Sequence, residues 1–242
     1  MITGQKDYQH LWQSVESWIT VHKWLREEPI PGQGDFGTTL YATPGVLGVY
    51  AMQEVRTDLT LPVQPPDRWL YAPTLECPNK ASLESVTVYK RAGTDSSTVR
   101  VYAVWNHITG GFVVWKPMDS TWLNTYTRIF AEGRMYSTEV IKLNNYWKVL
   151  LYNFNTSSWD LQASYFTETS RTDGWDIWES IFNGTCPRPL PNIESNKLQV
   201  WHNGTWKYVT PNSGFEGEWL YQWTCGYPKG WTDPFFHWWV NS

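Results

Sequence analysis

The segment Gly174–Glu179 places residues capable of acid–base chemistry beside residues that can hold a ring-shaped ligand. Its sequence is Gly-Trp-Asp-Ile-Trp-Glu. In a β-strand, Trp175 and Glu179 share one face. Asp176 and Trp178 share the other, so each face puts an indole ring beside a carboxylate. Such a pair can stack on a sugar ring and accept hydrogen bonds from its hydroxyls, although a structural strand with one buried and one solvated face has equal weight.

Carboxylates and one histidine are the candidate catalytic groups. Glycosidases need two carboxyl groups about 5 Å apart, or a wider gap for inversion, and a regular strand would point Asp176 and Glu179 to opposite faces. His107 lies near Arg100 and Tyr102 in one hairpin, and these are residue types that polysaccharide lyases use. Glu179, Asp176 and His107 are therefore the candidate catalytic residues of a glycoside hydrolase or a polysaccharide lyase, and whether the chain is an enzyme stays open.

Tryptophan is unusually abundant, at 18 of 242 residues, and many of these rings adjoin turn residues. Rings beside turns tend to be partly exposed, and exposed rings with polar neighbours suit ligands that have an apolar face and a polar edge. This pattern favours a glycan-binding, lectin-like protein whose partner is a polysaccharide or another glycan. A carbohydrate-active enzyme and a small-molecule-binding barrel are the alternatives. The predicted ligand-binding rings are Trp105, Trp159, Trp175, Trp178, Trp206 and Trp231.

Charge and motifs exclude several classes of function. The net charge is −4 and the Lys and Arg residues are scattered, whereas nucleic-acid binding leaves a basic footprint. No apolar run reaches the 18 residues that a membrane span needs. Phosphate-binding, dinucleotide-binding and zinc-protease motifs are absent, so we expect no cofactor and no metal. No motif is specific enough to indicate a family, and the oligomeric state stays open.

The three cysteines predict one disulfide. Cys186 and Cys225 both lie in turn-rich sequence, and we expect them to pair, with three buried thiols including Cys77 as the alternative. The first thirty residues do not read as a signal peptide. Because a disulfide is expected, we predict a secreted, extracellular protein whose leader is missing from this chain, with a cytoplasmic protein as the alternative.

The distribution of apolar residues predicts an all-β fold. Asp7–Leu25 has helical periodicity, whereas the chain after Thr39 alternates β-forming segments with turn residues. Asn203-Gly204 indicates a tight hairpin. We expect an N-terminal helical or irregular segment at residues 1–34 and a single β-rich domain at residues 35–242. The expected architecture is an antiparallel β-sandwich or jelly roll with a short N-terminal helix. A closed β-barrel is one alternative, and aromatic hairpins 47 and 49 residues apart make a five-bladed propeller the other.

Overall fold

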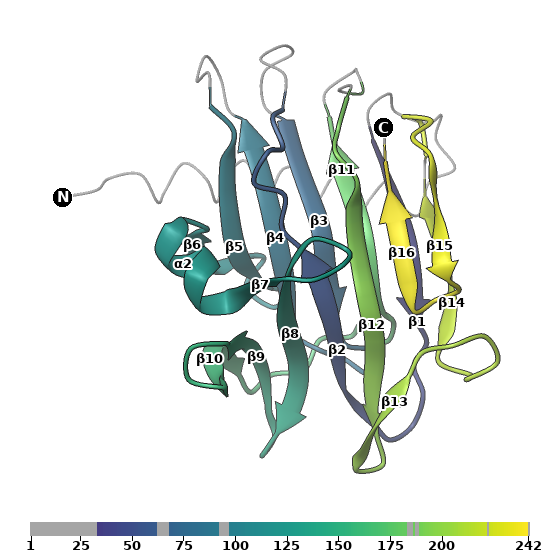
Figure 1. Ribbon diagram of the computed structural model, residues 1–242. Helices are drawn as coiled ribbons and strands as arrows, with labels where there is room; N and C mark the ends of the chain where they lie inside the picture. The colour runs from purple at the N-terminus through teal and green to yellow at the C-terminus, as the bar shows by residue number, and fades with distance from the viewer. Residues whose placement is uncertain are drawn as a thin grey trace.

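Two antiparallel β-sheets pack face to face in the computed structural model (Figure 1). The structure describes residues 33–61, 68–91, 97–182, 186, 189–221 and 223–241. The helix expected at Asp7–Leu25 lies outside the described residues. The division into residues 1–34 and 35–242 therefore stays a prediction.

The first sheet has seven strands in the order β14-β1-β11-β3-β4-β5-β6. Segments far apart in the sequence meet here, because β11 pairs with β1 on one side and with β3 on the other. The strands are β1 (Gln33–Leu40), β3 (Arg68–Glu76), β4 (Leu83–Arg91), β5 (Val99–Asn106), β6 (Gly111–Pro117), β11 (Gly174–Ile181) and β14 (Glu216–Tyr221).

The second sheet has nine strands, with the path β10-β9-β8-β2-β12-β16-β15 and with β13 paired to β12 and β7 to β8. Its central strand β2 joins the N-terminal part of the chain to β8 and β12. The strands are β2 (Val46–Glu54), β7 (Thr127–Ile129), β8 (Arg134–Leu143), β9 (Tyr146–Asn153), β10 (Ser158–Tyr165), β12 (Ile193–His202), β13 (Thr205–Tyr208), β15 (Lys229–Asp233) and β16 (His237–Val240).

Alternation along the strands builds the core between the sheets. On β2, Val49 and Ala51 belong to the main buried cluster, so Tyr50 between them faces outward. On β8, Thr138 and Val140 are fully buried, and Glu139 between them points to the same outer face as Tyr50. The inner positions therefore form the core, and the intervening positions form the outer face of the nine-stranded sheet.

The two-sheet arrangement confirms the predicted β-sandwich, whereas the closed-barrel and propeller alternatives are wrong. The three aromatic hairpins do form, as β5–β6, β9–β10 and β12–β13. They belong to two different sheets rather than to repeated blades. Asn203 and Gly204 both have positive φ, at 50° and 83°, as the predicted tight turn requires.

Sequence analysis missed the short helix α2 (Ser120–Tyr126). Asp119 caps it by accepting a 2.9 Å hydrogen bond from the backbone N–H of Trp122, which satisfies one of the free donors at the helix start. Trp122 is buried and stacks on Tyr102 at 5.7 Å between ring centroids. Seven residues are too few for a clear periodic signal, so only the cap could have indicated this helix. No helix in the described ranges is long and apolar enough to cross a membrane.

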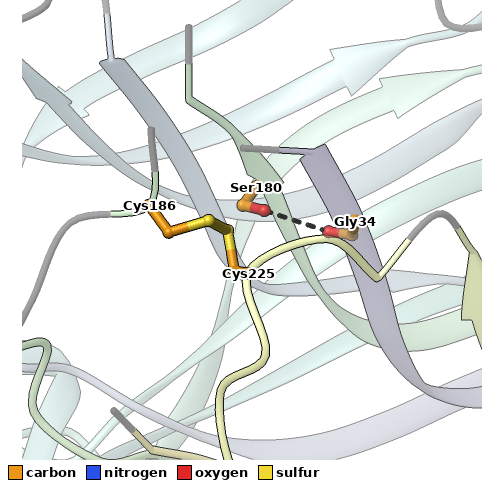
Figure 2. The surroundings of a disulfide bond; sticks show 4 residues. All are labelled: Gly34, Ser180, Cys186 and Cys225. Atoms are coloured by element: carbon orange, nitrogen blue, oxygen red, sulfur yellow. Dashed lines mark hydrogen bonds between the residues drawn. A yellow bond between two sulfur atoms is a disulfide. The ribbon is translucent and has the colours of Figure 1, made fainter. Parts of the chain in front are cut away.

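Cys186 and Cys225 form the predicted disulfide, which joins two connecting segments (Figure 2). Cys186 lies between β11 and β12, and Cys225 lies between β14 and β15. Near this bond, the Ser180 hydroxyl donates to the Gly34 carbonyl at 3.2 Å and helps to hold β11 against β1. Both connecting segments lead from the seven-stranded sheet to the nine-stranded sheet, so the disulfide fastens the two sheets at one end of the sandwich.

Candidate functional site

Asp176 lies between the sheets, where it has a structural environment. Its carboxylate accepts hydrogen bonds from the Gln53 amide at 3.0 Å and from the Trp238 indole N–H at 2.9 Å. Burial raises the pKa of Asp176 to about 6, although these hydrogen bonds oppose the shift. The carboxylate is fully enclosed and holds partners from the opposite sheet together.

Glu179 lies three residues further along β11, and the structure does not bring it to Asp176. It sits opposite Asp35 of β1 and Tyr71 of β3 and is half-buried. Because alternate residues of a strand face opposite ways, Asp176 points into the sandwich and Glu179 points away from it. The two carboxyl groups therefore do not form an acid–base pair with one another.

His107 lies instead between two glutamates at the end of the seven-stranded sheet. Glu76 on β3 and Glu84 on β4 are register partners, which places their side chains on one face. His107 follows β5, and its backbone N–H donates to the Ser82 carbonyl at 3.0 Å. Its Nε2 atom is 3.2 Å from Glu76 Oε2 and 3.4 Å from Glu84 Oε2. We call Glu76, Glu84 and His107 the carboxylate–histidine cluster.

Two further side chains fix the cluster. The Trp175 indole donates to Glu84 Oε1 at 2.9 Å, and Arg171 Nη1 lies 2.9 Å from His107 Nδ1. A guanidinium can only donate, so this contact makes Nδ1 the acceptor and keeps the ring proton on Nε2. Burial favours a higher pKa for Glu84, but hydrogen bonds from His107 and Trp175 and the nearby charge of Arg171 hold that pKa below its usual value.

The protonation of His107 depends on the two glutamates. Burial by itself lowers the pKa of His107, but the close negative charges of Glu76 and Glu84 outweigh it and raise the pKa to about 9. A second proton would have to enter at Nδ1, where Arg171 donates. The Arg171 contact at Nδ1 therefore opposes the second proton that the two glutamates favour.

Glu76 is the least satisfied member of the cluster. Its side chain is fully buried, and neither carboxylate oxygen has a hydrogen-bond partner of acceptable geometry among the described residues. Buried polar groups are nearly always hydrogen-bonded, and an unsatisfied buried carboxylate is costly. An unsatisfied carboxylate beside an imidazole is an arrangement in which a proton can move.

The ligand atoms of Glu76, Glu84 and His107 lie within 4.8 Å of one another and could hold a divalent metal ion. A metal bound at His107 Nε2 would need that nitrogen free of its proton. With Arg171 donating to Nδ1, the proton stays on Nε2, so a metal ion would have to displace the Arg171 contact. The observed hydrogen bonding therefore fits proton transfer better than metal binding.

The six rings predicted to bind a ligand do not gather at one place. Trp105, Trp175 and Trp178 are 1%, 6% and 1% exposed, because they lie on central strands of the seven-stranded sheet. Trp231 is half-buried against Phe36, with ring centroids 4.9 Å apart. Only Trp159 and Trp206 lie close together on one surface, where they flank Tyr50 on the outer face of the nine-stranded sheet.

Glu76, Glu84 and Glu139 were not among the candidate catalytic residues predicted from the sequence. Each is a carboxylate in a strand segment that otherwise lacks charged residues at the adjacent positions, as in Leu75-Glu76-Cys77 and Leu83-Glu84-Ser85. A charged residue at a position that the sheet buries needs a partner or a role. That interruption of the apolar pattern is the signal that could have identified all three.

Comparison with known proteins gives weak structural likenesses. No protein-family model matches the sequence, and no curated protein matches it. A structure described as scytalido-glutamic peptidase with a peptide-based transition state analog aligns at 12% identity and a TM-score of 0.48 over 86% of this chain and 98% of that chain. SCP-B, described as a member of the Eqolisin family of peptidases in complex with the tripeptide Ala-Ile-His, aligns at 12% identity and a TM-score of 0.49, covering 86% of this chain and 98% of that chain.

The sequence-based prediction of a lectin-like, carbohydrate-binding protein is wrong. Half of the predicted sugar-binding rings are buried, and the other three do not share one surface, because Trp231 packs against Phe36 away from Trp159 and Trp206. The alternative carbohydrate-active enzyme has no carboxylate pair at β11, since Asp176 and Glu179 are on opposite sides of the strand, as expected from the sequence, and Asp176 is enclosed between the sheets. The alternative barrel is excluded by the two-sheet fold, and a polysaccharide partner has no support.

Proposed function

We propose that this chain hydrolyses peptide bonds and that the carboxylate–histidine cluster is its acid–base centre. The observation that carries the proposal is the buried Glu76 carboxylate, unsatisfied among the described residues and 3.2 Å from an imidazole nitrogen. Strained or unsatisfied ionisable groups concentrate at functional sites. Ile108, next to His107, is 40% exposed, so the cluster lies just beneath the surface.

The cluster supplies both proton transfers that amide hydrolysis needs. Glu76 takes a proton from water as the water oxygen bonds to the carbonyl carbon. The C–N bond then breaks with its electron pair going to nitrogen. An amine leaves poorly unless it is protonated, and the imidazolium form of His107, which the two glutamates favour, donates a proton from Nε2 and recovers one from Glu76. Trp175 keeps the second carboxylate, Glu84, in place.

Replacing Glu76 by glutamine tests the proposal. The Glu76→Gln protein should cleave peptide bonds about 100-fold more slowly than the wild type, because removal of a general base typically lowers the rate 10²- to 10⁴-fold. The rate is measured as new amino termini released from an unfolded protein substrate between pH 3 and pH 8. Circular dichroism of both proteins establishes that the fold is retained.

Glu168→Gln is the matched control, because Glu168 is an exposed carboxylate that pairs with Lys142 and lies outside the cluster. It should cleave at the wild-type rate. The proposal is overturned if the wild type releases no amino termini at any pH, or if Glu76→Gln retains the wild-type rate.

Secretion is a further part of the proposal. The Cys186–Cys225 disulfide supports an oxidising compartment, since disulfides persist mainly there. Expression with a secretory leader should give protein in which this bond forms without added oxidant.

A further inference from the structure

The outer face of the nine-stranded sheet carries three aromatic rings around one point. Tyr50 on β2 lies between Trp159 on β10 and Trp206 on β13, with ring centroids 6.2 Å and 6.1 Å away. The interplanar angles are 85° and 65°, so the indoles stand nearly edge-to-face against Tyr50 rather than stacking flat on it. β9 and β8 lie between β10 and β2 in the sheet, and the Trp159–Tyr50 contact spans both.

A carboxylate lies within this group of rings. Glu139 on β8 is the register partner of Tyr50, which puts the two side chains next to each other on the outer face. Glu139 is 9% exposed, and its side chain makes no hydrogen bond or ion pair with the residues that the structure describes. Lys148 is the nearest cation in the strand register, two residues before the Leu150 partner of Glu139, and it forms no ion pair with it.

The neighbouring polar side chains form hydrogen bonds with other groups and not with Glu139. The Tyr50 hydroxyl lies 3.2 Å from the Ser137 hydroxyl, and the Gln199 amide, opposite Tyr50 on β12, donates to the Lys197 carbonyl. Glu139 is thus a largely buried carboxylate that lacks a counter-ion among the described residues. The faces of aromatic rings are electronegative and attract cations, most strongly when a ligand displaces water.

We propose that Tyr50, Trp159, Trp206 and the carboxylate of Glu139 form a binding site for an alkylammonium group. A methylated or primary ammonium has an apolar surface that fits against the rings and a positive charge that supplies the missing partner of Glu139. A neutral apolar group would leave the carboxylate unpaired. The ammonium can belong to a small amine or to a lysine side chain of a polypeptide.

This site is independent of the carboxylate–histidine cluster. Glu76 and Glu84 belong to the seven-stranded sheet and Glu139 to the nine-stranded sheet. Failure of one proposal would therefore leave the other unaffected, and each has its own variant and its own readout.

Titration with choline and with its neutral isostere 3,3-dimethylbutan-1-ol tests the charge requirement. Choline should change the fluorescence of the wild-type protein with saturation, and the neutral isostere should bind at least tenfold more weakly. Glu139→Gln and Trp159→Ala should each weaken choline binding about tenfold. Trp159 is 37% exposed, so its removal should leave the fold intact.

Trp115→Ala is the control, because Trp115 is a comparably exposed ring on β6 of the other sheet; it should bind choline as the wild type does. A peptide containing trimethyllysine forms the second arm. Tighter binding of the peptide than of choline identifies a polypeptide ligand, and the reverse order identifies a small amine. Equal binding of choline and its neutral isostere, or no binding of either ammonium probe, overturns the proposal.

Discussion

Replacement of Cys186 and Cys225 by serine is expected to lower the free energy of unfolding by about 4 kcal/mol, because the bond closes a long loop. The two residues are 39 apart in sequence. Cross-linking them removes conformational freedom from the unfolded chain, and the loop-entropy relation gives about 4 kcal/mol for a loop of this length. Most single domains are stable by only 5–15 kcal/mol, so the loss would be a large share of the total.

The position of the disulfide adds to this expectation. Cys225 packs in a buried cluster at this end of the sandwich, against which Trp223 and Trp231 are packed. Both linked segments connect one sheet to the other.

Urea unfolding of the wild type and of the double serine variant, with and without reductant, measures the effect. The reduced wild type should match the variant, and reductant should not change the variant. Thiol titration of the unfolded, unreduced wild type should find one thiol, from Cys77. Equal stability of the oxidised wild type and the variant would contradict the prediction.

The β-sandwich was predictable because it depends on local patterns. Alternation along β2 and β8 and the Asn203-Gly204 turn all appear in short windows of sequence, and the structure retains each of them. The disulfide was also predictable from the sequence, because Cys186 and Cys225 both lie in turn-rich segments. The capped helix α2 was missed because seven residues give no periodic signal.

The exposure of the tryptophans was not predictable, because it depends on where a strand lies in its sheet. Trp175 and Trp178 face opposite ways on β11, and both are buried. β11 pairs on both sides, with β1 and β3, although β1 precedes it by more than a hundred residues. A Gly-Trp turn signal therefore says little about a ring when its strand lies inside a sheet, between segments that are distant in sequence.

The two candidate sites depend on strand register in the same way. His107 meets Glu76 only because β3 pairs with β4 and β4 with β5, and Arg171 arrives from a loop much further along the chain. Trp159 and Trp206 were predicted from the sequence. Tyr50, which lies between them, and its register partner Glu139 belong to strands whose sequences give no local indication of a site. Strand register brings residues that are distant in sequence into one site, and a single sequence does not reveal the register.

Glu139→Gln is expected to make the protein more stable at neutral and alkaline pH and to leave its stability at pH 4 nearly unchanged. Burial raises the pKa of Glu139 to about 7 from an ordinary value of 4.5. Below pH 4.5 this carboxyl group is protonated in both the folded and the unfolded protein, so it does not change the free energy of unfolding. As pH rises towards 7, its ionisation favours the unfolded state and the free energy of unfolding falls. Above pH 7 this pKa shift corresponds to a wild-type free energy of unfolding that is lower by about 3 kcal/mol.

The difference in unfolding free energy between Glu139→Gln and the wild type, measured from pH 4 to pH 8, isolates this effect. Burial also raises the pKa of Glu54 and of Asp176, but those groups are present in both proteins and cancel in the difference. Glu168→Gln is a control of opposite sign, because the hydrogen bond from Lys142 lowers the pKa of Glu168, so that variant should lose stability as pH rises through the acid range. A pH-independent difference for Glu139→Gln would contradict the prediction.

The stability effect also bears on the ammonium site. A carboxylate that destabilises the fold at neutral pH has no structural reason to be present, since glutamine has nearly the same shape without the charge. Destabilising polar groups persist in folded proteins mainly where function requires them. Saturating choline should therefore stabilise the wild type more at pH 8 than at pH 5, because Glu139 is ionised at the higher pH while burial raises the pKa of the neighbouring Tyr50 and keeps it neutral. Glu139→Gln should lose this pH-dependent gain, and an equal gain at both pH values would separate the ammonium site from the Glu139 charge.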